Sequence, residues 1–124
     1  MNDNTADNPK DSENLNAQSE TQMRKGMLTY CVLLLLKDGK IYTSEIIRAL
    51  HEAELIVVEG TLYPLLSRLA KDNLLTYEWQ ESEQGPPRKY YWLTQEGQSL
   101  LVDLKANYHK LHNSIKRLEK GAQS

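Results

Sequence analysis

The sequence predicts a mainly α-helical fold with one β-hairpin and a long C-terminal helix. Residues 59–72 have the spacing of a helix with one apolar and one polar face. Two short aromatic segments flank the sequence Gly-Pro-Pro-Arg-Lys at 85–89, and residues 95–120 carry a heptad pattern. A solvent-facing helix beside a basic hairpin is the arrangement of a winged helix-turn-helix, so we expect that fold with an added dimerisation helix.

The length and composition fit one small domain. The chain has 124 residues, 40% of them apolar and none of them Phe, which makes a lean core that a second subunit can complete. The only cysteine, Cys31, lies in an apolar run, which is typical of a reducing compartment. Residues 1–20 contain no hydrophobic signal segment, and the apolar run 27–36 is about half the length that spans a bilayer. We therefore expect a cytoplasmic location.

Residues 1–20 are rich in Asn, Asp, Ser, Gln and Glu, and their acidic residues outnumber the single base Lys10. Such a segment buries too little apolar surface to offset the entropy of ordering, so we expect a disordered acidic and polar tail. The whole chain has a net charge of −2, which leaves the body from residue 21 onward weakly basic. This total charge identifies no partner, so the positions of the bases must do so.

The first helix is expected over residues 21–37, where apolar residues recur at helical spacing: Met23, Met27, Tyr30, Cys31 and Leu34. Further apolar residues at 32, 33, 35 and 36 extend around the cylinder. A helix that is apolar nearly all round is buried on more than one side. We therefore expect it to contact both its own domain and a partner subunit, and to end at Gly39.

Two shorter helices follow. The second is expected over residues 44–54, with Thr43 or Ser44 as its N-cap and a buried face made by Ile46, Ile47, Leu50 and Ala53. The third is expected over residues 59–72, and its core-facing residues are Leu62, Leu65, Leu66 and Leu69. Its outer face is centred on Gly60, Pro64, Ser67 and Lys71 and flanked by Thr61, Tyr63 and Arg68. Small residues near the start of this face would let a DNA groove approach closely.

The hairpin is expected from two strands, 74–80 and 89–94, around a tip at 81–87 that is rich in Gly and Pro. Leu75, Tyr77 and Trp79 alternate on one face, which indicates a twisted ribbon with one packed side. The aromatic run 90–92 could stack on unpaired bases. The sequence favours the alternative, in which these rings pack the ribbon against the first helix.

The final helix is expected over residues 95–120, with Thr94 as its N-cap. Its apolar residues are spaced three and four apart, as in a coiled coil: Leu101, Leu104, Tyr108, Leu111, Ile115 and Leu118. A body of this size cannot cover so long a stripe. We therefore expect this helix to pair with another chain, and the first helix to join that interface through Met27 and Leu34.

The chain resembles the PadR-like family of bacterial transcriptional regulators. The resemblance covers about residues 23–120 and rests on GTLYPLLSRL at 60–69, NLL at 73–75, GPPRKYYWLT at 85–94 and QEG at 95–97. It implies a homodimeric repressor of the subgroup with a short C-terminal helix, which dimerises through its last and first helices. Some members respond to phenolic or planar aromatic ligands. Val58 departs from the family, where a Ser N-cap is common two residues before the GTLYP glycine.

Binding of double-stranded DNA requires bases at phosphates and small or polar groups at base edges. The wing bases follow two stiffening prolines, and the resemblance implies that they contact the DNA backbone or minor groove. The predicted DNA-binding residues are Thr61, Tyr63, Pro64, Ser67, Arg68, Lys71, Arg88 and Lys89. The alternatives are a packing role for Tyr63, an ordinary solvated turn at the wing, and an acidic tail that competes with DNA phosphates.

The sequence does not favour an enzyme. An apolar helix would raise the pKa of Cys31, and His109 and His112 lack a third metal ligand, so we expect no catalytic residue, metal or cofactor. The second function class is a winged-helix module that holds protein partners with the same hairpin. Tyr108 is the predicted wall of a site for a planar aromatic or phenolic effector between two subunits, with seam filling as its alternative role.

Overall fold

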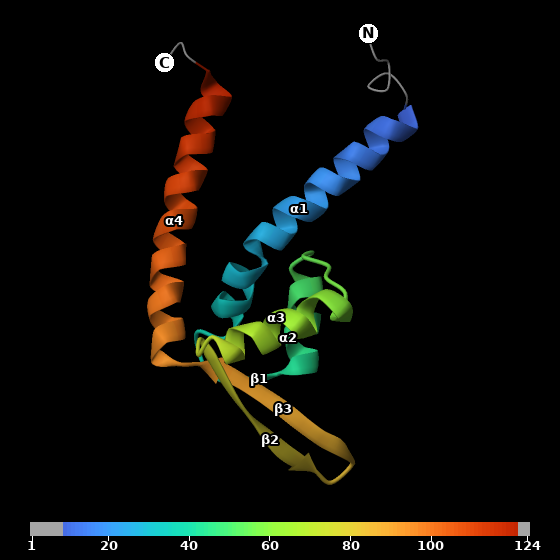
Figure 1. Cartoon of the computed structure of the whole chain (residues 1–124), viewed down its shortest axis with the longest axis vertical. Coiled ribbons are helices and arrows are strands. Elements are labelled where there is room, and N and C mark those ends of the chain that lie inside the picture. The colour runs from blue at the N-terminus through green and yellow to red at the C-terminus, as the bar shows by residue number, and fades with distance from the viewer. Residues whose placement is uncertain (1–8, 122–124) are drawn as a thin grey trace.

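The computed structural model describes residues 9–121, and these form a mainly helical body with a β-hairpin wing (Figure 1). The elements are, in order, α1 (Pro9–Leu35), β1 (Ile41–Tyr42), α2 (Thr43–Glu52), α3 (Glu59–Lys71), β2 (Leu75–Ser82), β3 (Gly85–Leu93) and α4 (Gln95–Lys120). The three strands make one sheet in the order β1-β3-β2. The predicted fold class is confirmed.

The N-terminal part of α1 corrects the prediction of a disordered tail. Residues 1–8 lie outside the described residues, but α1 begins at Pro9 and runs without a break into the body. Proline suits a first helical turn because its missing N–H has no intrahelical partner there. Helix propagation from the packed half of α1 then adds one hydrogen bond for each residue fixed. Side chains 12–20 are all exposed, so this extension forms with little burial inside its own chain.

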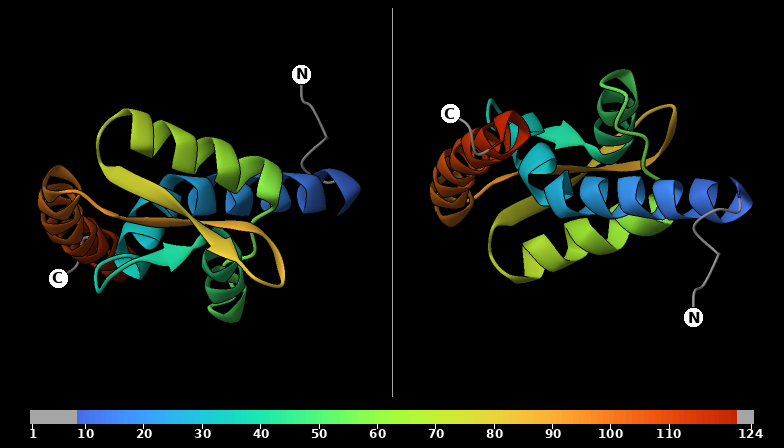
Figure 2. Two further views of the ribbon diagram at one scale, coloured as in Figure 1. Left: turned by 90° about the horizontal axis from the view of Figure 1, so that it is seen from below. Right: turned by 90° about the horizontal axis from the view of Figure 1, so that it is seen from above.

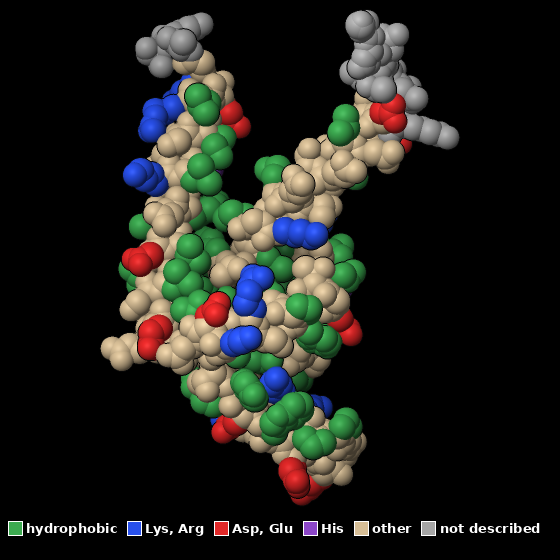
Figure 3. Space-filling model, viewed as in Figure 1, with side chains coloured by type: hydrophobic (Ala, Val, Ile, Leu, Met, Phe, Trp, Pro, Cys, Tyr) green, Lys and Arg blue, Asp and Glu red, His purple; other side chains and the backbone are tan. Residues whose placement is uncertain are grey.

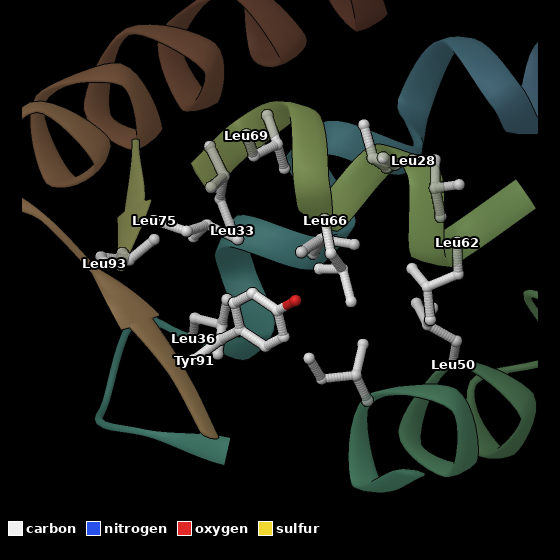
Figure 4. Packing of buried hydrophobic residues seen from close by; sticks show 13 residues of the cluster. Leu28, Leu33, Leu36, Leu50, Leu62, Leu66, Leu69, Leu75, Tyr91 and Leu93 are labelled. Atoms are coloured by element: carbon white, nitrogen blue, oxygen red, sulfur yellow. The ribbon is translucent and has the colours of Figure 1, made fainter. Parts of the chain in front are cut away.

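The core lies where the C-terminal half of α1, α2, α3 and the base of the sheet meet (Figure 4). All four core-facing leucines predicted for α3 are buried there, which confirms its orientation. The Tyr91 ring reaches the same cluster from β3, beside Leu36. The prediction for α2 is correct for Ile46 and Leu50, but Ala53 is exposed because the helix has already ended.

The start of α2 differs from its prediction. Tyr42, rather than Thr43 or Ser44, occupies the N-cap position, and the Glu45 carboxylate accepts a hydrogen bond from the Tyr42 backbone N–H at 3.3 Å. Tyr42 is extended because it also belongs to β1, which pairs with Tyr90 and Tyr91 of β3. The two-residue strand β1 is absent from the prediction. It ties the beginning of α2 to the middle of the wing.

A compact junction joins the end of α3 to the beginning of α4. Asn73 adopts a positive φ of 63°, and the Thr94 hydroxyl donates to its carbonyl oxygen at 2.7 Å. The same hydroxyl accepts from the Gly97 N–H at 2.9 Å, which confirms Thr94 as the N-cap of α4. A Cβ at Gly97 would collide with the Leu74 carbonyl oxygen, so only glycine allows α4 to start this close to β2.

The helix α4 leaves this junction and diverges from α1 (Figures 1 and 2). The described start of α1 and the described end of α4 both lie far from the wing. The apolar residues at heptad spacing along α4 form what we call the α4 seam: Leu101, Leu104, Tyr108, Leu111, Ile115 and Leu118. At its base, Leu101 and Leu104 are partly buried against the core. Halfway along, the rings of Tyr30 and Tyr108 lie 5.5 Å apart. Beyond that point the α4 seam is exposed, at 54% for Leu111 and 79% for Leu118.

Candidate nucleic-acid interface

A concave surface of about 540 Å³ separates α3 from the wing, and we call it the α3–wing groove. It is lined by Tyr42, Thr43, Ser44, Tyr63, Ser67, Trp79, Pro86, Pro87, Arg88, Lys89 and Tyr91. Four of the predicted DNA-binding residues, Tyr63, Ser67, Arg88 and Lys89, therefore lie together on one surface. They come from two elements that are far apart in the sequence.

The wing itself is longer than predicted. β2 continues to Ser82 and β3 begins at Gly85, so most of the expected tip at 81–87 is strand, and Arg88 and Lys89 are strand residues. The register shifts between Gln80 and Ser82, opposite the two prolines of β3. Proline cannot donate to a ladder and is tolerated at such a bulge. This local irregularity is why a Gly- and Pro-rich segment can still form a strand.

The two wing bases point to opposite faces of β3, as neighbouring strand residues must. The Lys89 ammonium lies 4.0 Å from the centre of the Tyr77 ring, with Trp79 and Tyr91 beside it. The Arg88 guanidinium lies 4.6 Å from the centre of the Tyr42 ring. Cation–π attraction of this kind limits the positions that a long side chain samples. Both charges are thus held against the rings instead of extending freely from a loop.

The remaining predicted residues of α3 divide into two sets. Pro64, Arg68 and Lys71 are exposed on the outer face, outside the α3–wing groove. Thr61 is half-buried and lines a separate cavity of about 180 Å³ beside Leu28 and Cys31 of α1. The structure therefore brings Thr61 to the wrong side of α3 for the groove. At about 100° per residue, Thr61 lies about 160° around the helix from Tyr63 and about 120° from Ser67, which places it on another side of α3.

The first turn of α3 is as open as its sequence indicates. Val58 occupies the N-cap position and makes no side-chain cap. Its carbonyl oxygen accepts from the Thr61 N–H at 3.0 Å and from the Leu62 N–H at 3.1 Å. A Cβ built at Gly60 would meet no atom within 4 Å. Internal packing therefore does not require glycine at this position. A macromolecule could approach the backbone closely there.

The face of the wing opposite to Lys89 is held by an ion pair. The Lys40 ammonium donates to the Glu78 carboxylate at 2.7 Å and lies over the rings of Tyr90 and Trp92. The hydrogen bond from Lys40 and a weaker one from Gln80 lower the pKa of Glu78. The rings of Tyr90 and Trp92 are half-buried, which agrees with packing, but their partners are Lys40 and Tyr42 rather than α1.

Seven groove residues were not among the predicted site residues. Four of them, Trp79, Pro86, Pro87 and Tyr91, belong to the wing, and three lie together at the start of α2: Tyr42, Thr43 and Ser44. The Thr43 hydroxyl donates to the Lys89 carbonyl oxygen at 3.3 Å, which fixes the start of α2 beside the wing. Thr43 and Ser44 stand out in the sequence only as capping residues. A polar helix start just before an apolar helix could have marked this edge of the groove, because helix N-termini attract phosphate groups.

Three further observations concern the thiol, metal ligands and helix length among residues 9–121. Burial raises the pKa of the Cys31 thiol, in the predicted direction. No group of three or more His, Cys, Asp or Glu side chains within that range is placed to hold a metal ion. None of the described helices is long and apolar enough to cross a membrane.

The helical body, the exposed face of α3 and the adjacent hairpin define a winged helix-turn-helix protein. A sequence model of the PadR-like family of transcriptional regulators matches residues 32–103. The chain belongs to this family. No curated protein matches the chain significantly.

Solved structures of family members agree with this assignment. A PadR-like transcription factor from Bacteroides fragilis is 56% identical, with a TM-score of 0.70 over 82% of this chain and 98% of that chain. A PadR family regulator from Eggerthella lenta is 29% identical, with a TM-score of 0.82 over 90% of this chain and 97% of that one. Bacillus subtilis PadR, solved in complex with operator DNA, is 27% identical, with a TM-score of 0.58 over 63% of this chain and 45% of that one.

Proposed function

We propose that this protein is a homodimeric transcriptional repressor that binds a palindromic site in double-stranded DNA in the bacterial cytoplasm. The observation that carries the proposal is the α3–wing groove, where polar residues of α3 face two fixed cations of the wing. The operator complex of the Bacillus subtilis relative supports the same type of partner.

The two sides of the α3–wing groove have different roles in this proposal. Ser67 and Tyr63 belong to the exposed face of α3 that enters the major groove, where hydroxyl groups can read base edges. Arg88 and Lys89 neutralise phosphates or enter the flanking minor groove, which supplies affinity without reading sequence. Arg68 and Lys71, near the end of α3, extend the basic surface along the same face.

Dimerisation follows from the exposed part of the α4 seam. Tyr108, Leu111, Ile115 and Leu118 form a continuous apolar stripe that the chain itself leaves open (Figure 3). An obligate interface would bury such a stripe. In a two-fold dimer the two copies of α3 then lie about 34 Å apart, or a simple multiple of that, so that both enter one face of the duplex.

An effector site between α1 and α4 extends the proposal. A cavity of about 270 Å³ lies there, lined by Met27, Tyr30, Leu104, Tyr108 and Leu111, with Gly26, Thr29, Leu100 and Asn107. Its lining is largely apolar, and the ring of Tyr108 forms one wall, which suits a planar aromatic or phenolic molecule. Such a molecule would act by binding more tightly to one spacing of the two α3 helices than to another.

Selection from a random double-stranded DNA library tests the proposal. We expect enrichment of inverted repeats and a steep loss of affinity with salt, because released counterions drive the binding. Ser67→Ala should change the enriched half-site, whereas a Thr61→Ala control should not, since Thr61 faces away from the α3–wing groove. A protein-binding module would enrich no sequence and would show a shallow salt dependence.

A further inference from the structure

A cavity of about 180 Å³ lies between α1 and the segment that leads from α2 into α3, and we call it the α1–loop cavity. Apolar side chains line it from both sides: Leu28 of α1, and Leu55, Ile56, Val57 and Val58 of the connecting segment. Leu28 is buried, and Leu55 and Val57 are half-buried. Protein interiors contain few voids larger than a water molecule. A hollow of this size with apolar walls is therefore suited to hold an apolar group.

The rim of the α1–loop cavity carries two positive charges. Arg24 and Lys25 both line it, and none of the lining residues that the structure describes is acidic. Lys25 is exposed and pairs with no carboxylate among residues 9–121, while Arg24 has only the exposed Glu20, at 3.5 Å. A guanidinium has five N–H donors, so Arg24 can bind a second carboxylate beside that of Glu20. The rim therefore complements an anionic group attached to an apolar one.

The α1–loop cavity is separate from the cavity between α1 and α4. The two share no lining residue. At about 100° per residue, Leu28 lies about 160° around α1 from Tyr30, whose ring contacts Tyr108 of α4. The α1–loop cavity thus opens on the side of α1 that faces away from α4 and from the proposed dimer interface. A second subunit on α4 would leave it accessible to small molecules.

We propose that the α1–loop cavity binds a short aliphatic carboxylate of about four to six carbon atoms. Its chain lies against Leu28 and Val57, and its carboxylate binds Arg24 and Lys25. The size follows from the volume, because an apolar cavity of roughly 150 Å³ holds a molecule as large as benzene. None of the described lining residues is aromatic, which favours an aliphatic chain over a flat ring. The occupant also borders Thr61, in the first turn of the proposed reading helix α3.

A single thiol reports whether the cavity is occupied. Cys31 is the only cysteine of the chain and lines the α1–loop cavity. In the full-length protein, hexanoate at about ten times its dissociation constant should slow the alkylation of Cys31 by N-ethylmaleimide about tenfold. Acetate has the same charge but almost no chain, so it should give no protection. The amide NMR signals that hexanoate shifts should cluster at residues 21–31 and 55–61.

A series of chain lengths tests the size of the cavity. From butanoate to hexanoate, the affinity measured by titration calorimetry should rise about fourfold with each methylene group, because each one is buried. In longer carboxylates the gain should stop, since the cavity is full and the rest of the chain lies in water. Adsorption on exposed apolar surface would instead strengthen steadily with chain length, and that result would contradict a cavity of limited size.

A neutral analogue and a charge variant test the rim. The alcohol 1-hexanol should bind about tenfold more weakly than hexanoate, because it lacks the charge-assisted hydrogen bonds. Arg24→Gln/Lys25→Gln should weaken hexanoate binding to the level of hexanol and leave hexanol binding unchanged. Lys37→Gln/Arg48→Gln removes the same charge outside the cavity and should bind hexanoate as the wild type does.

Two results would overturn the proposal. If hexanoate neither protected Cys31 nor shifted the amide signals around the cavity, the cavity would not be a carboxylate site. If hexanol bound as tightly as hexanoate, Arg24 and Lys25 would not select an anion. None of these measurements uses DNA, so their failure is distinguishable from a failure of the proposed DNA binding.

Discussion

The Thr94 hydroxyl donates a hydrogen bond to the Asn73 carbonyl oxygen at 2.7 Å, across 21 residues of sequence. Asn73 follows the end of α3 and Thr94 caps the start of α4, so one side chain joins the proposed reading helix to the proposed dimer helix. The Asn73 amide strengthens the joint by donating to the Glu96 carboxylate at 2.9 Å. The angle between the two helices is thus fixed by specific hydrogen bonds near Gly97.

Thr94→Ala should destabilise the protein by about 1 kcal/mol, as expected for loss of an N-cap that also satisfies a backbone carbonyl. Thr94→Ser retains the hydroxyl and serves as the control. Urea unfolding followed by circular dichroism measures the difference. Equal midpoints for the alanine variant and the wild type would show that the junction adds nothing to stability.

Gly97→Ala should be more damaging than the cap variant, because its methyl group would collide with the Leu74 carbonyl oxygen. We expect a loss of about 1–3 kcal/mol, typical of overpacking. Gly60→Ala is the matched control, since nothing lies within 4 Å of its added Cβ, and there we expect up to about 1 kcal/mol of gain from helix propensity. Differential scanning calorimetry distinguishes the expected loss of stability in Gly97→Ala from the expected gain in Gly60→Ala. Equal melting temperatures would contradict the predicted collision.

The Lys40–Glu78 pair predicts a pH dependence. Because the folded pKa of Glu78 is lowered, its contribution to stability is present above the ordinary pKa of Glu and is lost as the pH falls through the lowered value. Lys40→Met should raise the pKa of Glu78 toward its ordinary range, as measured by carbon NMR of the carboxyl group. Lys37→Met removes a lysine that pairs with Asp38 and should leave this pKa unchanged. If the pKa of Glu78 did not rise in the Lys40→Met variant, a group other than Lys40 would be responsible for its lowered value.

Planar aromatic molecules should bind at Tyr108 if the effector site is correct. A screen read by the fluorescence of Trp79 and Trp92 and by release of DNA would identify them, and Tyr108→Ala should weaken binding of any hit. Tyr108→Phe retains the ring and should preserve binding. Hits that bind the alanine variant as tightly as the wild type would leave Tyr108 with its seam-filling role.

The sequence predicts the strongly patterned elements well. α4 begins and ends at the predicted residues, and α3 ends one residue before its prediction, because leucine spacing and the Thr94 cap are local signals. β1 is two residues long and exists only through its pairing with β3, so no periodicity could reveal it. The helical start of α1 could not be predicted from burial, since side chains 12–20 are all exposed.

The candidate site is predictable in part for a similar reason. Motif and helix periodicity locate Tyr63 and Ser67 on the outer face and place the two bases on the wing. The sequence does not reveal that Lys89 lies over Tyr77 and Arg88 over Tyr42, because those contacts depend on strand register and on β1. Thr61 lies outside the groove because helix rotation places it more than about 100° from both Tyr63 and Ser67.

Salt-titrated DNA binding of the wing double variant tests the central claim most directly. Arg88→Ala/Lys89→Ala removes four cations from a dimer, so the slope of log affinity against log salt should become shallower by roughly 3 to 4, with similar weakening on all sequences. Lys25→Ala/Lys37→Ala removes the same charge outside the groove and outside α4, and should keep the wild-type slope. Unchanged affinity and slope in the wing variant would contradict DNA binding through the α3–wing groove.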